Sequence, residues 1–257
     1  MPRANRYILP GRIYHLTHRC HDRQFLLRFA KDRDGYRHRL REALRSVNAS
    51  LLTYNITSNH VHLLTYADAT EQIAELMQQV AGEFARDYNR RKQRSGAFWE
   101  GRYHATMVGS GEYLWECLRY VELNMVRCGV VKHPADWAWS GYGELMGWRK
   151  RNRLLDEEKL LWLLRCEDTA AFRKQFNWWL EDAMINDRLR REAKWSQSIA
   201  VGDRAYLETI DQQIRGRQQL QVEEQGGSWI LQECYGAFSE PQNSSISIRR
   251  LAGSIAL

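Results

Sequence analysis

Two histidines separated by one residue form the part of this 257-residue sequence best suited to chemistry. His60 and His62 flank Val61 in the run 51–64, which is predicted to form two short strands joined by a turn. A strand sends alternate side chains to one face, so the two imidazoles project together, about 6.6 Å apart along the strand. Paired imidazoles on a core-facing side suit a divalent metal ion, although such a triplet also occurs by chance in ordinary strands.

A tyrosine and an asparagine form the second candidate group. Residues 110–129 are predicted to form one helix, in which Tyr120 and Asn124 lie one turn apart on the same side. A phenol one turn from a metal-binding amide is what a metal-assisted tyrosine nucleophile requires. Without the histidine pair, a tyrosine at the edge of the core and an asparagine that helps to end the helix would explain the pattern better. Glu122 is predicted to face solvent.

Basic residues are concentrated in the part of the chain that holds these groups. Residues 1–154 contain 25 Lys and Arg against 15 Asp and Glu, whereas the remainder contains 13 against 16. Most of the basic residues are Arg, whose planar guanidinium suits phosphate groups. A solvated helix face explains some of them, but a polyanionic partner, most simply nucleic acid, explains the asymmetry better.

Cysteine usage and hydropathy limit the cellular setting. The five cysteines are scattered, odd in number and without a CxxC pair, so disulfides and a zinc ribbon are not expected. No signal peptide is recognisable, and no apolar run approaches the roughly 20 residues that span a bilayer. The sequence therefore predicts a cytoplasmic protein with no membrane partner.

The hydrophobic patterns predict the element order β-α-β-β-α-β, which is typical of a ferredoxin-like α+β fold with helices on one face of the sheet. The last strand of this order is predicted near residues 102–108, directly before the tyrosine helix. Three further helices are predicted, over residues 154–164, 169–184 and 202–214. The chain is accordingly divided into a domain of residues 1–150, a mostly helical C-terminal extension of residues 151–238 and a loosely ordered tail of residues 239–257.

Three stretches of the sequence resemble the HUH-type single-tyrosine transposases, and within them the REP-associated tyrosine transposases of bacteria. They are His60-Val61-His62, residues 95–103 (Ser-Gly-Ala-Phe-Trp-Glu-Gly-Arg-Tyr), and residues 120–124 (Tyr-Val-Glu-Leu-Asn) followed by Val126 and Arg127. The resemblance covers residues 3–150 well and the remainder thinly. It identifies residues 1–150 as an HUH catalytic domain.

The resemblance implies that His60, His62 and Asn124 hold a divalent metal ion, Mg²⁺ or Mn²⁺, and that Tyr120 is the nucleophile. It implies an enzyme: a DNA transposase that cleaves and rejoins single-stranded DNA near hairpins such as REP repeats, through a 5′-phosphotyrosine link and without a small-molecule substrate. Such a protein would act at the nucleoid, as a monomer or a homodimer. One departure is Met125, where many relatives have Pro; Met allows the helix to run on past Asn124.

Weaker predictions concern basic residues that could contact DNA phosphates: Arg12, Arg19, Arg23, Arg90, Arg91, Lys92 and Arg94. For the first three, a solvated surface explains the residue equally well. Three other functions stay open. A hairpin-binding protein without strand transfer would keep the fold but not the chemistry. A replication or mobilisation nickase would share the chemistry, but usually carries a helicase or a second tyrosine. An RNA-binding ferredoxin-like domain needs an aromatic-rich strand pattern that this sequence does not have.

Overall fold

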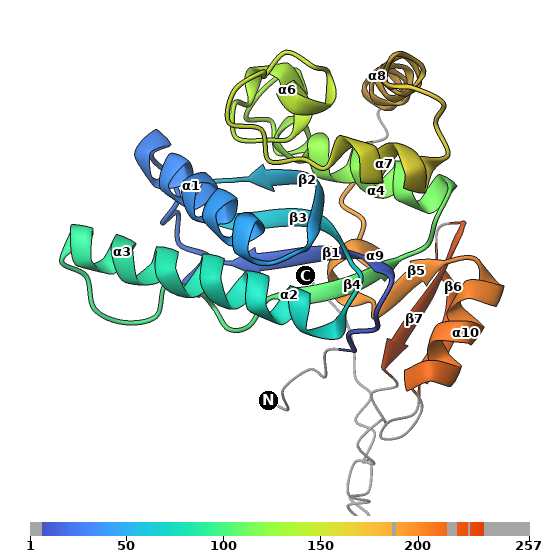
Figure 1. The fold of residues 1–257 in the computed structure, drawn as a ribbon, viewed down its shortest axis with the longest axis horizontal. Helices are drawn as coiled ribbons and strands as arrows, with labels where there is room; N and C mark the ends of the chain where they lie inside the picture. Colours follow the sequence, from blue (N-terminus) through green and yellow to red (C-terminus); the bar gives the residue numbers. More distant parts are fainter. Residues whose placement is uncertain (1–6, 187–188, 215–219, 226, 234–257) are drawn as a thin grey trace, which may run out of the picture.

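A seven-stranded mixed sheet with the order β2-β3-β1-β4-β5-β7-β6 runs through the protein (Figure 1). The computed structural model describes residues 7–186, 189–214, 220–225 and 227–233. The predicted tail of residues 239–257 lies outside the described residues. The strands are β1 (Arg12–Arg19), β2 (Ser50–Ile56), β3 (His60–Ala67), β4 (His104–Val108), β5 (Ala200–Gly202), β6 (Leu220–Gln225) and β7 (Ser228–Glu233).

The first four strands form the predicted ferredoxin-like unit. They alternate with α1 (Ala30–Ser46) and with α2 (Thr70–Met77), which continues through a π turn at Gln78–Gly82 into α3 (Glu83–Lys92). Strand β1 pairs antiparallel with both β3 and β4, and β3 pairs antiparallel with β2. The α+β ferredoxin-like order is confirmed, and the histidine strand β3 lies between β2 and β1.

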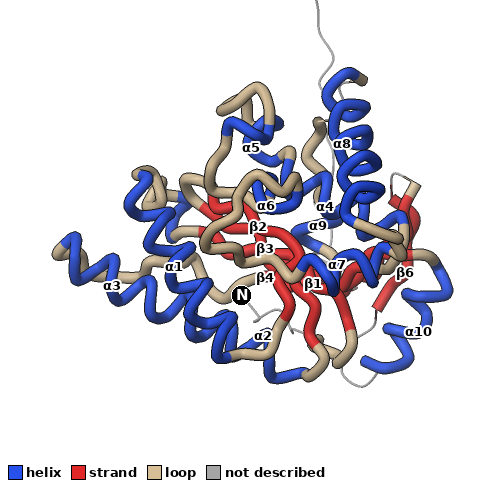
Figure 2. The backbone as a smooth tube through the Cα atoms, turned by 45° about the horizontal axis from the view of Figure 1, so that its top comes forward, coloured by secondary structure: helices blue, strands red, loops and turns tan. Residues whose placement is uncertain are grey.

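The sheet separates two hydrophobic cores, because successive side chains of each strand point to opposite faces. Tyr14 and Leu16 of β1 pack with the core that α1, α2 and α3 cover. Ile13 of β1 and Leu64 of β3 pack with the other core. His60 and His62 share the alternation of Leu64, so the histidine pair lies on this second face. Figures 1 and 2 show the sheet between the two layers of helices.

The second face is covered by the tyrosine helix and by part of the C-terminal extension. These elements are α4 (Glu112–Glu122), the single turn α5 (Asn124–Arg127), α6 (Tyr142–Leu145), α7 (Glu157–Leu164) and α8 (Thr169–Ile185). Trp115 of α4 stacks on Phe172 of α8, with ring centroids 5.4 Å apart. The predicted one-sided arrangement of helices is therefore correct for α1 to α3, while a second layer covers the face that carries the histidines.

The C-terminal extension is helical, as predicted, and it also enlarges the sheet. Its helices include α9 (Lys194–Gln197) and α10 (Arg204–Ile214), in addition to α7 and α8. Strand β5 pairs in parallel with β4, and β7 and β6 follow in antiparallel order. These three strands were not predicted. The boundary at residues 150 and 151 stays a prediction, since the sheet is continuous across the two parts.

No helix in the part of the chain that the structure describes is both long enough and apolar enough to cross a bilayer.

Candidate active site

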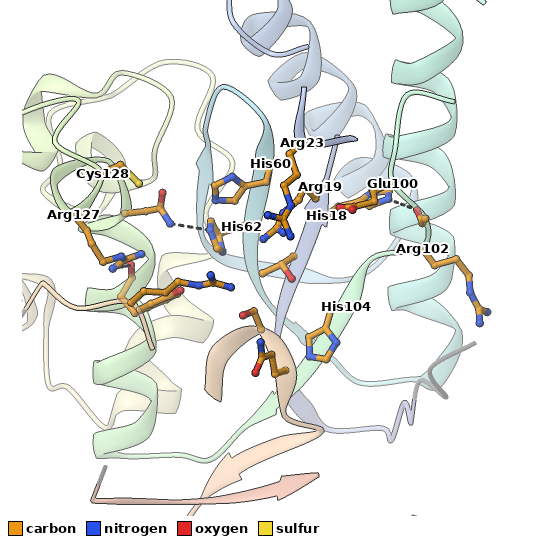
Figure 3. A pocket seen from close by; sticks show the side chains of 17 residues that line it. His18, Arg19, Arg23, His60, His62, Glu100, Arg102, His104, Arg127 and Cys128 are labelled. Atoms are coloured by element: carbon orange, nitrogen blue, oxygen red, sulfur yellow. Dashed lines mark hydrogen bonds between the residues drawn. The ribbon is translucent and has the colours of Figure 1, made fainter. Parts of the chain in front are cut away.

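A cavity of about 650 Å³ opens where β1 ends and β3 begins. Its wall includes His60 and His62 from β3, together with Tyr120 and Asn124 from the tyrosine helix. The structure thus brings together, in one cavity, the four residues that sequence reasoning assigned to metal binding and nucleophilic attack. Five arginines also line the cavity: Arg19, Arg23, Arg102, Arg127 and Arg191. Figure 3 shows the two histidine rings between Arg127 on one side and Arg19 on the other.

The ring of His60 is fixed through its Nδ1 atom. This atom lies 2.7 Å from Asn59 Oδ1 and 2.9 Å from Thr57 Oγ1. Since the amide oxygen can only accept a hydrogen bond, Nδ1 carries the proton and donates it. Burial lowers the pKa of His60 to about 4, so the ring is neutral at neutral pH and keeps a lone pair on Nε2.

The ring of His62 is fixed by a third histidine, His15 on β1. His15 Nδ1 lies 2.8 Å from the carbonyl oxygen of Trp195, so it must donate there. Burial lowers the pKa of His15 to about 3, and the neutral ring therefore presents a lone pair on Nε2. His62 Nδ1 donates to that atom over 2.9 Å. This chain of hydrogen bonds leaves His62 with a lone pair on Nε2, directed at Asn124.

Asn124 faces His62 at the start of α5. Its Nδ2 atom lies 2.9 Å from His62 Nε2, while its buried Oδ1 atom has no hydrogen-bond partner among the described residues. The tyrosine helix is interrupted at Leu123, whose φ and ψ are −78° and 3°. Hydrogen bonds from Leu123 N to Arg119 O (2.9 Å) and from Arg127 N to Leu123 O (2.8 Å) span the interruption. Tyr120 and Asn124 consequently stay one turn apart.

The helix continues past Asn124 through Met125 and ends at Arg127. Gly129 adopts a φ of +67°, a left-handed conformation that glycine accommodates without strain. Its backbone N donates to Val126 O over 2.8 Å, and Val130 N donates to Met125 O over 3.0 Å. The helix therefore runs on past Asn124, as expected with Met at position 125, and the glycine terminates it within one further turn.

Tyr120 is packed among aromatic and cationic groups. Its ring meets those of His15 and His62 edge-on, each with centroids 6.0 Å apart. The guanidinium carbon of Arg127 lies 4.1 Å from the centroid of the Tyr120 ring. Burial raises the pKa of Tyr120, and the nearby positive charge of Arg127 partly opposes this. The phenol is therefore protonated at neutral pH, and Arg127 is the group that most favours its ionised form.

The sequence of this region matches a known family. Residues 10–124, which include both histidines, Tyr120 and Asn124, match the family model described as "Transposase IS200 like". These residues belong to the IS200-like transposase family. It is a family of HUH-class nucleases whose members generally use a divalent metal ion.

Two solved structures are similar to the chain. One is a REP-associated tyrosine transposase bound to a REP hairpin, with 18% identity over 56% of this chain and 84% of that chain, and a TM-score of 0.49. The other is a candidate transposase from Deinococcus radiodurans R1, with 22% identity over 42% of this chain and 85% of that chain, and a TM-score of 0.33. No curated protein matches the chain.

The residues of this cavity fit a divalent metal ion. Two imidazole Nε2 lone pairs face the site, and the buried Oδ1 of Asn124 lacks a partner. Rotation of the Asn124 amide by 180° would turn Oδ1 toward His62, and the two orientations are nearly indistinguishable by shape. Among the described residues no cluster of three His, Cys, Asp or Glu could hold a metal ion.

The predicted DNA-contacting residues divide into two groups. Arg19 and Arg23 line the cavity. Arg12 lies at the opposite end of β1, where it donates to Gln213 Oε1 over 3.3 Å. The run at the end of α3 lies outside the cavity lining: Arg90 pairs with Asp87, Arg91 pairs with Asp32, Lys92 lies over Phe29, and Arg94 donates to Ala97 O. Contact with DNA at these outer positions stays a prediction.

Several residues of the site were not identified from the sequence. His15 belongs to the predicted strand at residues 12–18, but nothing in its spacing distinguishes it from a core residue. Arg191, Ser196 and Gln197 reach the cavity from the C-terminal extension. Their position depends on the pairing of β5 with β4, which joins segments more than ninety residues apart.

Glu122 is buried, so the prediction that it faces solvent is wrong. Its exposed fraction is 1%, and Thr53 of β2 donates a hydrogen bond to its carboxylate. Gly141 completes the enclosure: a Cβ atom there would lie 2.2 Å from Thr53 Oγ1 and 3.0 Å from Glu122 Oε1. Burial raises the pKa of Glu122 to about 8. The carboxyl group therefore holds its proton in the folded protein at neutral pH.

Proposed function

We propose that this chain is a metal-dependent DNA strand transferase that cleaves and rejoins single-stranded DNA through a covalent link to Tyr120. The observation that carries the proposal is the convergence of His60, His62, Asn124 and Tyr120 on one cavity lined by five arginines. Two neutral imidazoles and an amide suit a labile Mg²⁺ or Mn²⁺ site rather than a structural zinc site. Membership of residues 10–124 in the IS200-like transposase family supports the same chemistry.

The proposed first step is attack by the Tyr120 hydroxyl oxygen on a backbone phosphorus atom. The bond between Tyr120 Oη and phosphorus forms while the bond from phosphorus to the 3′ oxygen breaks. Tyr120 loses its proton, and the departing oxygen leaves as a free 3′-OH. The 5′-phosphotyrosine link conserves the energy of the phosphodiester, so a second 3′-OH can reverse the step and join new strands.

The protein's own side chains supply orientation and charge. His60, His62 and Asn124 would hold the metal ion, which when bound supplies a Lewis acid that neutralises charge on the phosphate. Arg127 favours the ionised form of Tyr120 from its position over the ring. Arg19, Arg23 and Arg191 can bind phosphates on either side of the scissile bond.

The proposed partner is single-stranded DNA that carries a hairpin, because both transfer steps require a strand that can enter the cavity. Hairpins of the REP type are proposed from the resemblance of the motifs. The site of action would be the nucleoid, in the cytoplasm. The alternative function is sequence-specific hairpin binding without strand transfer, which needs the arginines but not Tyr120.

One experiment distinguishes these functions. The purified chain is incubated with a labelled library of single-stranded hairpins and Mn²⁺, or Mg²⁺, and resolved on denaturing gels. A covalent protein–DNA band is expected for the wild type and not for Tyr120→Phe or His60→Ala. Tyr113→Phe, on the same helix but outside the cavity lining, should keep the band. Hairpin binding without a covalent band under both metals would rule out the enzyme and leave the binding protein.

A further inference from the structure

His15 connects the C-terminal extension to the histidine pair. The residue has no exposed surface, and it lies behind His62 rather than among the residues that line the cavity. The rings of His15 and His62 are nearly parallel, with an interplanar angle of 5° and centroids 5.0 Å apart. Both nitrogens of His15 are engaged, one by the Trp195 carbonyl at 2.8 Å and one by His62 at 2.9 Å.

The segment that supplies the Trp195 carbonyl is anchored on several sides. Lys194 lies 3.1 Å from Glu116 of α4 and 2.9 Å from Ser228 of β7. Ser198 O accepts hydrogen bonds from Thr106 Oγ1 (2.9 Å) and His104 Nε2 (3.1 Å), both on β4. Trp195 itself is fully buried. The carbonyl is therefore a fixed acceptor, and it decides which nitrogen of His15 carries the proton.

The direction of the hydrogen bonds determines what His62 presents to the cavity. A fixed acceptor at Trp195 makes His15 donate from Nδ1 and accept at Nε2. His62 must then donate from Nδ1, and its lone pair on Nε2 faces Asn124. Outer hydrogen bonds of this kind hold a metal-binding histidine in one tautomer and one orientation.

We propose that His15 is a positioning residue for His62, and that the C-terminal extension is thereby part of the active site through the Trp195 carbonyl. The inference rests on the proposed metal role of His62. It assigns a task to residues 193–198 that a purely structural brace would not have. It also explains why a histidine occupies a fully buried position where an apolar residue would pack without any polar requirement.

Two readouts test the proposal on the full-length chain without any measurement of activity. The first is the tautomer of His62, read from long-range ¹H–¹⁵N spectra of ¹⁵N-histidine-labelled protein without metal. Wild-type His15 and His62 are expected as Nδ1–H tautomers. Phe at position 15 has no acceptor, and the Asn amide ends short of the position that His15 Nε2 occupies. In His15→Phe and His15→Asn, the His62 signal is therefore expected to change to the Nε2–H form.

The second readout is the Kd for Mn²⁺, measured by electron paramagnetic resonance. His15→Phe and His15→Asn should weaken binding by about 10- to 100-fold. His15→Gln can offer its amide oxygen where Nε2 stood, so it should restore the Nδ1–H tautomer of His62 and most of the affinity. Leu16→Ala is the control, because it damages the other core from the same strand without touching His62.

Each result has a distinct meaning. An unchanged His62 tautomer in both His15→Phe and His15→Asn would overturn the positioning role, whatever the metal affinity. A changed tautomer with unchanged Mn²⁺ affinity would overturn the link between His15 and the metal site. Wild-type protein that binds no Mn²⁺ would refute the proposed metal site itself, while the tautomer measurement would still decide the role of His15.

Discussion

The guanidinium of Arg127 lies over the ring of Tyr120, with its carbon 4.1 Å from the ring centroid. Arg127 follows Asn124 within the same short turn, so Tyr120, Asn124 and Arg127 come from one continuous stretch of chain. Burial lowers the pKa of Arg127 and raises that of Tyr120, and the attraction between guanidinium and phenolate opposes both changes. The pair therefore sets how readily Tyr120 ionises.

Replacement of Arg127 by Gln should move the pH dependence of covalent adduct formation to higher pH. Loss of the positive charge removes the main influence that lowers the pKa of Tyr120. We expect a displacement of about one pH unit and adduct formation about tenfold slower near neutral pH. Initial rates measured with a cleavable hairpin between pH 6 and 10 would check this. Arg119→Gln is the matched control, since Arg119 lies over Trp179 outside the cavity lining; equal profiles for both variants would contradict the prediction.

Arg191 should contribute to DNA binding from the C-terminal extension. It lines the cavity, whereas its exposed neighbour Arg190 does not. Arg191→Ala is expected to weaken binding of a single-stranded hairpin and to reduce the slope of log K against log salt by about 0.7. Fluorescence anisotropy at several salt concentrations gives this slope. Arg190→Ala should change it less, and an equal change in the two variants would mean that only overall charge matters.

Acid should destabilise the protein through its buried histidines. The pKa of His15 is lowered to about 3, that of His60 to about 4, and that of His62 well below its usual value, all chiefly by burial. Positive charges of Arg19, Arg127 and Arg191 face this group and lower these pKa values further. Below about pH 6.5 the unfolded chain binds protons that the folded chain does not, so stability falls as pH falls toward 4.

The size of this effect can be measured by urea unfolding. Each histidine accounts for up to about 1.4 kcal/mol per pH unit within that window. His62→Gln should therefore flatten the dependence of the unfolding free energy on pH between 6.5 and 4. If the unfolding free energy of His62→Gln has the same pH dependence as that of the wild type, His62 takes up a proton as readily in the folded chain as in the unfolded chain.

Glu122→Gln should stabilise the protein at alkaline pH. The carboxyl pKa is raised to about 8, so between about pH 4.5 and 8 the folded chain holds a proton that the unfolded chain releases, and stability falls as pH rises. A neutral amide removes this dependence, and we expect a gain on the order of 2 kcal/mol at pH 8 in thermal or urea unfolding. A loss of stability at pH 8 would contradict the prediction.

Glu144→Gln should have the opposite effect to Glu122→Gln, because the buried Glu144 carboxylate forms an ion pair with Arg37. It lies 2.9 Å from Arg37 Nη2 and 3.1 Å from Tyr54 OH, and it accepts from Leu154 N over 2.6 Å. Removal of its charge leaves the half-buried Arg37 guanidinium without its charged partner, at a cost of about 3 kcal/mol. The two substitutions should therefore move the unfolding free energy in opposite directions.

The grouping of the candidate site residues could be predicted because each pair depends on local geometry. Alternation along one strand puts His60 and His62 together, and the helical period does the same for Tyr120 and Asn124. Periodicity also predicted the first four strands, the helices that connect them, and the helices near residues 157–164, 169–185 and 204–214.

The features that could not be predicted from the sequence depend on contacts between distant segments of the chain. Strand β5 has three residues, and β6 is largely half-exposed and polar, so neither carries a readable pattern. Glu122 was misjudged because its cover comes from Ser140 and Gly141, which bridge to β2 through a hydrogen bond from Gly141 N to Tyr54 O of 2.8 Å. His15 gains its significance only from Trp195, 180 residues further along the chain.

The attachment of β5 to β4 has a consequence for assembly. A four-stranded ferredoxin-like sheet would leave β4 as a border with unpaired amide and carbonyl groups, on which another polypeptide could add a strand. Here Met107 N and Gly109 N donate to Ile199 O and Val201 O, each over 2.8 Å. This border of the four-stranded unit is thus already closed by the chain itself. Within the described residues, β2 and β6 are the outermost strands. The outer edge of β2 is already bonded to the chain through Gly141 N to Tyr54 O (2.8 Å) and Ile56 N to Trp139 O (2.9 Å), so growth of the sheet by a second molecule is expected at β6.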